Sequence, residues 1–150
     1  MNFNMKIIYQ TSAGGIVFKK LVTSHQSLVT TWLICQHSQH KGWVFPKGFV
    51  GDKDKNESNE TAALREVQEE GGVKTKIIDQ RPIISTYEYR FEGNLYKKTV
   101  YYFLMEYISG DPKNHDWEMM DAKFMAEDEV KKTLSYPSDK EAFAKILQGL

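Results

Sequence analysis

The chain has 150 residues, of which 41% are hydrophobic, and its 20 lysines and arginines balance its 20 aspartates and glutamates. This length suffices for one domain with a proper core and is short for two, so we expect a single domain over residues 1–150. The zero net charge and the lack of any apolar run near the ~20 residues that span a bilayer exclude nucleic acid and membranes as expected partners.

The first predicted element is a strand from Lys6 to Lys20, with the small residues Ser12-Ala13-Gly14-Gly15 in its middle. Glycines inside a strand pattern indicate a bend, or a place where another backbone or a ligand comes close. The residues before this strand lack the apolar core of a secretory signal, so we expect a cytoplasmic protein.

The run Leu28 to Gln36, LVTTWLICQ, predicts a central strand, since it is apolar and rich in β-branched residues. It contains the single cysteine, Cys35, which we interpret as a buried strand residue and not as a nucleophile. The loop that follows carries His37 and His40, whose spacing could suggest a zinc site. Because no third soft ligand accompanies them, an exposed polar loop is the favoured interpretation.

The segment Trp43 to Gly48, WVFPKG, predicts a strand that ends at Pro46, because proline cannot donate a hydrogen bond to a sheet. Gly48 would then let the backbone turn toward the next helix. Lys47 would then reach a substrate cleft, where its flexible ammonium can pair with a phosphate. A solvated loop lysine is the alternative.

A helix is predicted from the N-cap residue Ser58 to Gly71-Gly72, a pair that suits a helix C-cap. On this helix Glu66 lies one turn from both Glu69 and Glu70, so three carboxylates share one face. Such like charges repel one another unless a cation lies between them, and carboxylate oxygens suit a hard divalent cation such as Mg²⁺ or Mn²⁺. For an isolated glutamate pair, a solvated acidic face would be the simpler interpretation.

The stretch Gly51 to Val73 resembles the full signature of the Nudix hydrolases, with its glycine, first glutamate, REVQEE run and final GV at the signature's offsets. The resemblance implies an α/β fold, namely a Nudix-type α/β/α sandwich with a mixed, partly closed β-sheet. It also implies a catalytic site that uses Mg²⁺ or Mn²⁺.

In the resembling family the glutamates of this helix bind the metal, which carries that role onto Glu66, Glu69 and Glu70. The resemblance also implies that Glu57 and Arg65 form an ion pair that braces the loop against the helix. Arginine suits this role, since its rigid fork can hold a carboxylate through two hydrogen bonds.

The loop before Glu57 departs from the family pattern, because FVGDKDKNE after Gly48 is longer than usual. The family uses a backbone carbonyl near the loop glycine as a further metal ligand. Either Gly48 or Gly51 could supply the tight turn, and our prediction is Gly48, which we also place among the metal ligands.

Strands are predicted over Lys74 to Asp79, Pro82 to Phe91 and Lys97 to Ile108, with a turn at Glu92-Gly93-Asn94 between the last two. The aromatic face of this hairpin is either ordinary sheet packing or a stacking platform, on which each base contact contributes ~1–3 kcal/mol.

The string KTVYYF from Lys98 is similar to the matching strand of the dinucleoside tetraphosphate hydrolases, a Nudix branch. There the lysine faces the polyphosphate and hairpin tyrosines help to hold adenine, so the resemblance gives these roles to Lys98 and to Tyr87 or Tyr89. The WxxPKG form of Trp43 to Gly48 resembles the same branch and the diphosphoinositol polyphosphate hydrolases, and adds Trp43 to the substrate-binding candidates.

A glutamate from a mobile loop binds metal or acts as the base in the resembling hydrolases. Glu118, six residues before Phe124 in the predicted strand Ala122 to Met125, is the candidate here. Asp116 and Asp121 are close rivals, and a plain loop acid is the alternative. Two helices, over residues 126–134 and 137–147, are predicted to end the chain.

The resemblance as a whole implies Mg²⁺-dependent hydrolysis of a phosphoanhydride in a nucleoside diphosphate linked to another group. The expected substrate is a small nucleotide, diadenosine tetraphosphate cleaved to ATP and AMP, and the expected assembly is a monomer or homodimer. Enzymatic alternatives act on an inositol pyrophosphate, an RNA 5′-triphosphate or a nucleoside triphosphate. A nucleotide-sensing module without catalysis is an alternative of another class, which the intact glutamates disfavour.

Overall fold

The structure, a computed structural model, describes residues 4–150. It contains a mixed sheet of eight strands, three α-helices and one short 3₁₀ helix. The strands are β1 (Ile7–Val22), β2 (Leu28–His37), β3 (Trp43–Val44), β4 (Lys47–Phe49), β5 (Val73–Ile77), β6 (Ile83–Phe91), β7 (Asn94–Gly110) and β8 (Met119–Ala126). The helices are α1 (Asn59–Gly71), η1 (Pro112–Asn114), α2 (Glu127–Thr133) and α3 (Pro137–Gln148).

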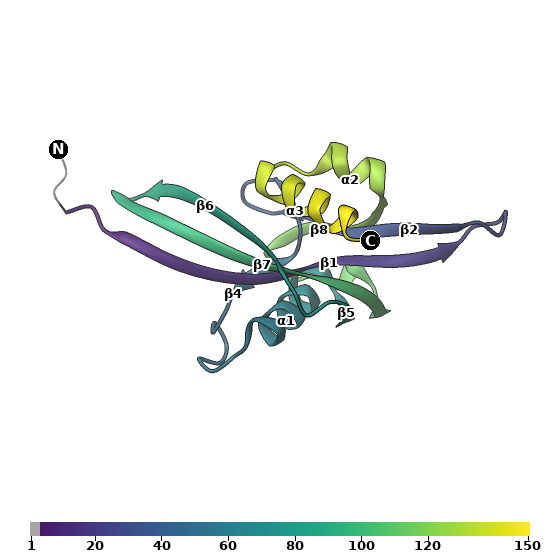
Figure 1. Cartoon of the computed structure of the whole chain (residues 1–150), viewed down its shortest axis with the longest axis horizontal. Coiled ribbons are helices and arrows are strands. Elements are labelled where there is room, and N and C mark those ends of the chain that lie inside the picture. The colour runs from purple at the N-terminus through teal and green to yellow at the C-terminus, as the bar shows by residue number, and fades with distance from the viewer. Residues whose placement is uncertain (1–3) are drawn as a thin grey trace.

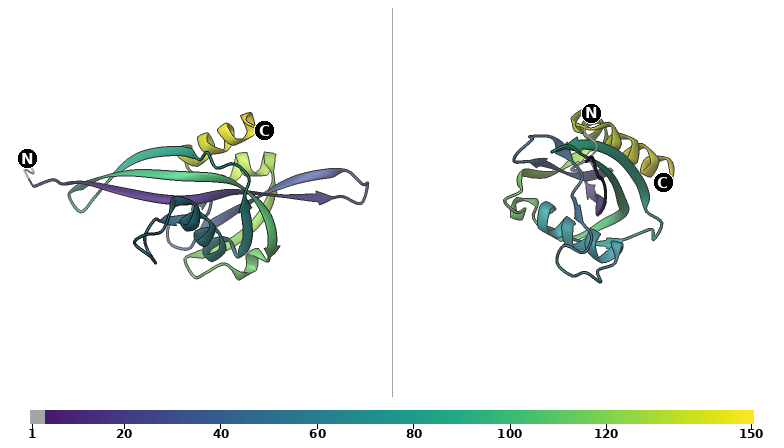
Figure 2. Two further views of the ribbon diagram at one scale, coloured as in Figure 1. Left: turned by 60° about the horizontal axis from the view of Figure 1, so that its bottom comes forward. Right: turned by 90° about the vertical axis from the view of Figure 1, so that its left-hand side faces the viewer.

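Helix α1 covers one face of the sheet, and α2 and α3 cover the other (Figure 1). The end-on view in Figure 2 shows the same three layers, with the sheet between α1 and α3. The main strand path runs β3-β2-β1-β7-β5, while β4, β6 and β8 pair with β1, β7 and β2. The predicted α/β/α sandwich with a mixed sheet is therefore confirmed, and the sheet is not closed.

The two longest strands, β1 and β7, run parallel and pair from Ile7 with Leu95 to Phe18 with Glu106. On its other edge, each of these strands pairs with two further strands, one after the other along its length. Strand β7 pairs first with β6 and then with β5, whereas β1 pairs first with β4 and then with β2. The sheet therefore splays into two arms, which project to either side of the helices in Figure 2.

The small residues of β1 mark a close approach of backbones. A Cβ on Gly14 would lie 2.2 Å from the carbonyl oxygen of Pro46, and the backbone N–H of Gly15 donates to that same oxygen. Strand β1 passes this point without interruption, so of the two predicted reasons for the glycines the close approach is confirmed.

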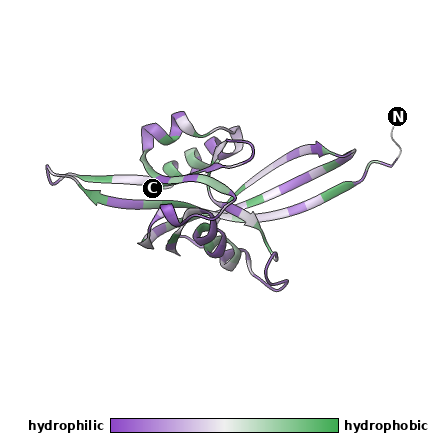
Figure 3. Ribbon diagram, turned by 180° about the vertical axis from the view of Figure 1, so that it is seen from behind, coloured by the Kyte–Doolittle hydropathy of each residue, from purple (hydrophilic) through white to green (hydrophobic). Residues whose placement is uncertain are grey.

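Each face of the sheet carries its own apolar core. Ala63 and Val67 of α1 pack with Val17, Leu33 and Met105 on one face. The core of the other face includes aromatic and aliphatic side chains of the sheet, of the link between β3 and β4, and of α3, namely Ile16, Trp32, Phe45, Tyr102, Phe143 and Ile146. Hydrophobic and hydrophilic stretches alternate along the helices (Figure 3), as expected for helices that cover a sheet. Within residues 4–150, no helix is long and apolar enough to cross a membrane.

Asp139 is a buried carboxylate in the first turn of α3, with 2% of its surface exposed. Its Oδ1 accepts a hydrogen bond of 2.7 Å from the hydroxyl of Tyr102. Burial raises the pKa of Asp139 above its usual value, and this outweighs the opposing effects of Lys47 and of the Tyr102 hydroxyl. Folding therefore favours the protonated carboxyl.

Asp139→Asn is expected to remove a pH dependence of stability. A folded-state pKa above the unfolded one contributes stability at low pH that is lost as the pH rises through the folded pKa. Asparagine still accepts the Tyr102 hydrogen bond but cannot ionise. The variant's free energy of unfolding in urea should therefore rise relative to the wild type's as the pH increases above about 4. The exposed Asp128→Asn is the control; parallel pH curves for Asp139→Asn and the wild type would contradict this account.

Candidate active site

A cleft of about 620 Å³ lies between α1, β4 and the loop that precedes β8. Six carboxylates and three lysines line it, so the cleft carries an excess of acid. The carboxylates belong to Asp52, Glu66, Glu69, Glu70, Asp116 and Glu118, and the lysines are Lys47, Lys53 and Lys98. The other lining residues are Ser12, His37, His40, Val44, Gly48, Phe49, Tyr87, Trp117 and Met119.

Helix α1 forms as the sequence predicts and delivers its three glutamates to the cleft. The Ser58 hydroxyl caps its first turn by accepting the N–H of Thr61, and Gly72 ends it with a φ of 74°. Glu66 and Glu70 are each only 5% exposed, whereas the side chain of Glu69 is 36% exposed. The shared face that the spacing predicts is therefore present, and two of its members are buried.

Burial dominates the electrostatics of these glutamates. Desolvation raises the pKa of Glu66 to about 7, against the lowering effect of the Arg65 guanidinium. It raises the pKa of Glu70 to about 8, against the hydrogen bond from the Lys47 N–H. A cation bound beside these carboxylates would favour their ionised forms, so proton and metal would compete for the site.

The donor set fits a hard divalent cation, because it consists of carboxylate oxygens at the wall of an acidic cleft. Within residues 4–150, however, no three acidic, histidine or cysteine side chains already converge as a metal cage. Arg65 Nη1 holds Glu66 and Glu69, and Glu70 accepts the N–H of Lys47. Water and substrate phosphate would have to complete the coordination, which is usual for Mg²⁺.

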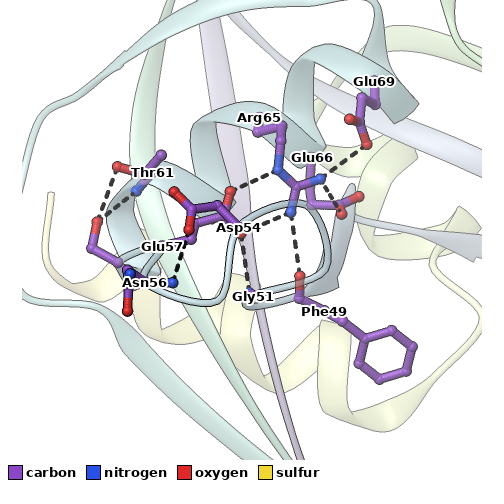
Figure 4. Close-up of polar contacts among 10 residues, drawn as sticks. Phe49, Gly51, Asp54, Asn56, Glu57, Thr61, Arg65, Glu66 and Glu69 are labelled. Carbon is purple, nitrogen blue, oxygen red and sulfur yellow. Dashed lines mark hydrogen bonds and ion pairs between the residues drawn. The ribbon is translucent and has the colours of Figure 1, made fainter.

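Arg65 and Glu57 do not line the cleft. They form an ion pair that joins the loop to α1 (Figure 4). Arg65 Nε and Nη2 donate to the two oxygens of Glu57 at 2.7 and 2.9 Å. Nη1 of the same guanidinium donates to Glu66 at 2.8 Å and to Glu69 at 3.2 Å. The hydrogen bonds from Arg65 lower the pKa of Glu57 and tie the loop to the face of α1 that carries Glu66 and Glu69.

The tight turn of this loop is at Gly51, so the prediction that Gly48 supplies it is wrong. Gly51 has a φ of +82°, and its N–H donates to Glu57. Gly48 lies within β4 and pairs with Ala13. The added residues after Gly48 let β4 continue to Phe49, which moves the turn along the chain.

Gly48 is required for a different reason. A Cβ at this position would lie 2.1 Å from the carboxyl carbon of Glu66. Only a residue without a side chain leaves room for that carboxylate against β4. Gly48 therefore belongs to the site, and its proposed role as a metal ligand through the backbone carbonyl stays a prediction.

Both predicted phosphate-binding lysines line the cleft. Lys47 stands on β4, and Lys98 on β7 has its Nζ 4.8 Å from the ring centroid of Phe49. Burial and, to a smaller extent, the neighbouring Lys47 together lower the pKa of Lys98 to about 8. An anion bound between the two would offset this repulsion.

Of the two candidate tyrosines, the structure brings only Tyr87 to the cleft. Tyr87 pairs with Lys98 across β6 and β7, whereas Tyr89 lies farther along the arm. The ring of Tyr89 stacks on Tyr96 at 4.9 Å, and its hydroxyl donates to Gln10. Both tyrosines share one face of β6, so only their distance along the strand separates them.

Trp43 does not line the cleft either. Its ring lies beneath the Nζ of Lys123, 5.1 Å away, and its backbone N–H donates to Ser135. It packs against the edge of the core shared by the sheet and α3. The residue therefore supports the fold near the cleft and contributes no surface to it.

The loop before β8 brings Glu118 and Asp116 to the cleft, while Asp121 lies outside the lining and 3.6 Å from Lys123. Asp116 Oδ1 accepts the N–H of Glu118, and the N–H of Asp116 donates to the carbonyl of Glu69. Asp116 thus fixes the loop against α1. The Glu118 carboxylate has no hydrogen-bond partner in the described part of the chain, so of the three acids it is the best placed candidate for the base.

Several lining residues were not among the sequence candidates, notably Ser12, His37, His40 and Trp117. Ser12 is fully buried, and among residues 4–150 its hydroxyl has no hydrogen-bond partner. A buried hydroxyl without a partner is costly, and here it lines the cleft, where a bound group can satisfy it. The small-residue run that contains Ser12 is predicted to mark a place where another backbone or a ligand comes close, but Ser12 is not singled out within it.

Residues 18–146 match the family model described as NUDIX domain. The chain belongs to the Nudix family. A Mycobacterium tuberculosis protein with the provisional name mutator protein MutT4 is 26% identical over 149 residues. These residues make up 97% of this chain and 57% of that relative, so the chain spans little more than half of the relative's length.

Solved structures share the fold. The crystal structure of C. elegans Ap4A hydrolase is 22% identical, with a TM-score of 0.67 and coverage of 95% of this chain and 98% of that chain. The MutT protein from Methanosarcina mazei is 17% identical, with a TM-score of 0.64 and coverage of 99% and 98%. A Nudix hydrolase from Nitrosomonas europaea is also 17% identical, at 0.64, with coverage of 93% and 89%. At these identities the likeness is one of fold.

Proposed function

We propose that this chain is a single-domain, cytoplasmic Nudix pyrophosphohydrolase that uses Mg²⁺ or Mn²⁺. The observation that carries the proposal is the pair of buried glutamates, Glu66 and Glu70, at the wall of a cleft whose acids outnumber its lysines. Such a wall is electrostatically unfavourable by itself and becomes favourable when it holds a divalent cation. Membership of the Nudix family supports the same chemistry.

Glu66, Glu69 and Glu70 would hold the cation, which when bound lowers the pKa of a water and draws charge from the bridging phosphate oxygen. Glu118 lines the same cleft and would take the proton of the attacking water. Lys47 and Lys98 would pair with the phosphate oxygens. Arg65 and Glu57 would act as positioning residues, because their ion pair holds the loop and Arg65 also bonds Glu66 and Glu69.

The proposed substrate is diadenosine tetraphosphate, cleaved to ATP and AMP. Tyr87 and Lys98 face each other across two strands inside the cleft, which places an aromatic ring beside a phosphate-binding group. That pairing suits a nucleoside joined to a polyphosphate. The C. elegans protein with a similar fold is named Ap4A hydrolase, which agrees with this choice. Inositol pyrophosphates lack a base and would leave Tyr87 unused.

A substrate panel tests the proposal. The purified chain is incubated with Mg²⁺ or Mn²⁺ and diadenosine tetraphosphate, an inositol pyrophosphate, a 5′-triphosphorylated RNA or a nucleoside triphosphate, and products are resolved by chromatography. We expect ATP and AMP in equal amounts from the first compound at the highest kcat/KM. No metal-dependent hydrolysis of any of them would contradict the enzyme proposal and favour a nucleotide-sensing module.

Tyr87→Leu is expected to weaken the binding of diadenosine tetraphosphate about 5- to 150-fold, since stacking a base contributes ~1–3 kcal/mol. The binding of an inositol pyrophosphate should change little. Tyr89→Leu is the matched control, because Tyr89 lies on the same strand outside the cleft. Calorimetric titration with the metal and a non-hydrolysable analogue measures both variants; equal losses for Tyr87→Leu and Tyr89→Leu would refute stacking on Tyr87.

A further inference from the structure

His37, at the end of β2, and His40, in the loop that follows, form a stacked pair that lines the cleft. Their ring centroids are 4.2 Å apart and their planes differ by 9°. The backbone around them is anchored to the neighbouring loop, because the N–H of Ser38 donates to the carbonyl of Glu118. The pair is therefore held beside the loop that carries the proposed base.

The backbone fixes which nitrogen of each ring carries the proton. Nδ1 of His37 accepts the N–H of Gln39 at 3.1 Å, and Nδ1 of His40 accepts the N–H of Gly42 at 3.0 Å. The Tyr136 hydroxyl lies 2.9 Å from the same Nδ1 of His40. A nitrogen that accepts a backbone N–H cannot carry a proton, so each neutral ring is protonated at Nε2.

The two Nε2–H groups are available to donate hydrogen bonds to a ligand. Among residues 4–150, neither has a hydrogen-bond partner within the protein. Binding a metal through Nε2 would require that proton to leave or to move to an Nδ1 that already faces a backbone N–H, which argues against zinc. Burial, His37 and Lys47 together lower the pKa of His40, which keeps its ring in the neutral donor form.

We propose that His37 and His40 form a two-donor subsite for the phosphoryl oxygens of a polyphosphate chain, outside the segment held at the Glu66 to Glu70 wall. The proposal rests on the proposed function of the cleft. Non-bridging phosphoryl oxygens only accept hydrogen bonds and recur along the chain, whereas the edge of a base mixes donors with acceptors. Two N–H donors on stacked rings, in the lining of a cleft that also contains Lys47, match the first pattern. The pair would thus favour longer phosphate chains.

Asparagine and glutamine separate the two functions of each ring. His37→Asn and His40→Asn keep an oxygen where Nδ1 accepts the backbone N–H but remove the distal donor. His37→Gln and His40→Gln instead place an amide N–H near the Nε2 position. His25→Asn, in the exposed β1–β2 loop outside the cleft, is the matched control.

The first measurement uses inorganic tripolyphosphate and does not depend on turnover. Long-range ¹H–¹⁵N spectra of the wild-type rings should show Nε2–H tautomers for His37 and His40 whose signals shift on titration. Each asparagine variant should bind tripolyphosphate about 3- to 10-fold more weakly, the equivalent of one hydrogen bond, with partial recovery in the glutamine variants. Nδ1–H tautomers, or unchanged binding in both asparagine variants, would overturn the proposal.

The second measurement compares chain lengths with the active enzyme. The asparagine variants should raise the KM for diadenosine tetraphosphate several-fold more than that for a diphosphate-linked substrate such as ADP-ribose, with little change in kcat. Equal effects at both lengths would count against a subsite beyond the metal wall. An inactive wild-type chain would sink the proposed function and leave the tripolyphosphate titration to decide the subsite.

Discussion

Glu69→Gln is expected to lower Mg²⁺-dependent kcat by about 10²- to 10³-fold, the size of effect seen when one preorganised electrostatic group is removed from an active site. The substitution exchanges one ligand charge for an amide of the same shape. Its side chain is 36% exposed and its ion pair with Arg65 is 3.2 Å long, so stability should fall by no more than about 1 kcal/mol. Steady-state kinetics and thermal unfolding measure the two effects separately.

Glu60→Gln provides the matched control, since Glu60 lies in the first turn of the same helix and does not line the cleft. It should retain wild-type kcat. Raising the Mg²⁺ concentration should recover part of the Glu69→Gln activity if the lost group is a ligand. A wild-type rate in Glu69→Gln would end the assignment of this residue to the metal.

Gly48→Ala is the second change with a large expected effect. Its new Cβ would lie 2.1 Å from the carboxyl carbon of Glu66, so that side chain has to turn away from the cleft wall. We expect kcat to fall by about 10²- to 10³-fold, as for the loss of a ligand. Stability should fall by only about 1–3 kcal/mol, because the carboxylate that the new Cβ crowds lies at the end of a flexible side chain and can move aside. Enzyme kinetics and urea unfolding measure these losses.

Gly51→Ala separates the two glycines. At a φ of +82° an alanine is strained by about 1–2 kcal/mol, but its Cβ would meet nothing closer than 3.8 Å. This variant should lose stability and keep most of its kcat. The reverse pattern, with Gly51→Ala inactive and Gly48→Ala active, would place the critical glycine at the turn.

Local chemistry made much of the fold predictable. Helix α1 begins after Ser58 and ends before Gly72, because a hydroxyl cap and a left-handed residue act within one turn of the chain. The hairpin of β6 and β7 turns at Glu92 and Gly93, both at positive φ, within the predicted Glu92-Gly93-Asn94 turn. The shared face of the three glutamates likewise follows from helical periodicity alone.

The features that the sequence did not reveal depend on contacts between distant segments. Gly48 is needed because the carboxylate of Glu66, on helix α1, lies against it. Trp43 lies outside the cleft lining, with its ring beneath the Nζ of Lys123. His37 and His40 are predicted as an exposed polar loop, and the pairing of β2 with β8 brings them to the cleft wall. The register between strands determines which residues of distant segments become neighbours, and the periodicity within one strand does not reveal that register.

The most direct test of the central claim is to locate the metal. Crystals of the protein grown with Mn²⁺ and a non-hydrolysable diadenosine tetraphosphate analogue would show each manganese ion through its anomalous scattering. We predict a peak within coordination distance of the carboxylates of Glu66, Glu69 and Glu70, bridged to the phosphates of the analogue. Manganese bound elsewhere, with these carboxylates still held by Arg65 and the Lys47 N–H, would contradict the account.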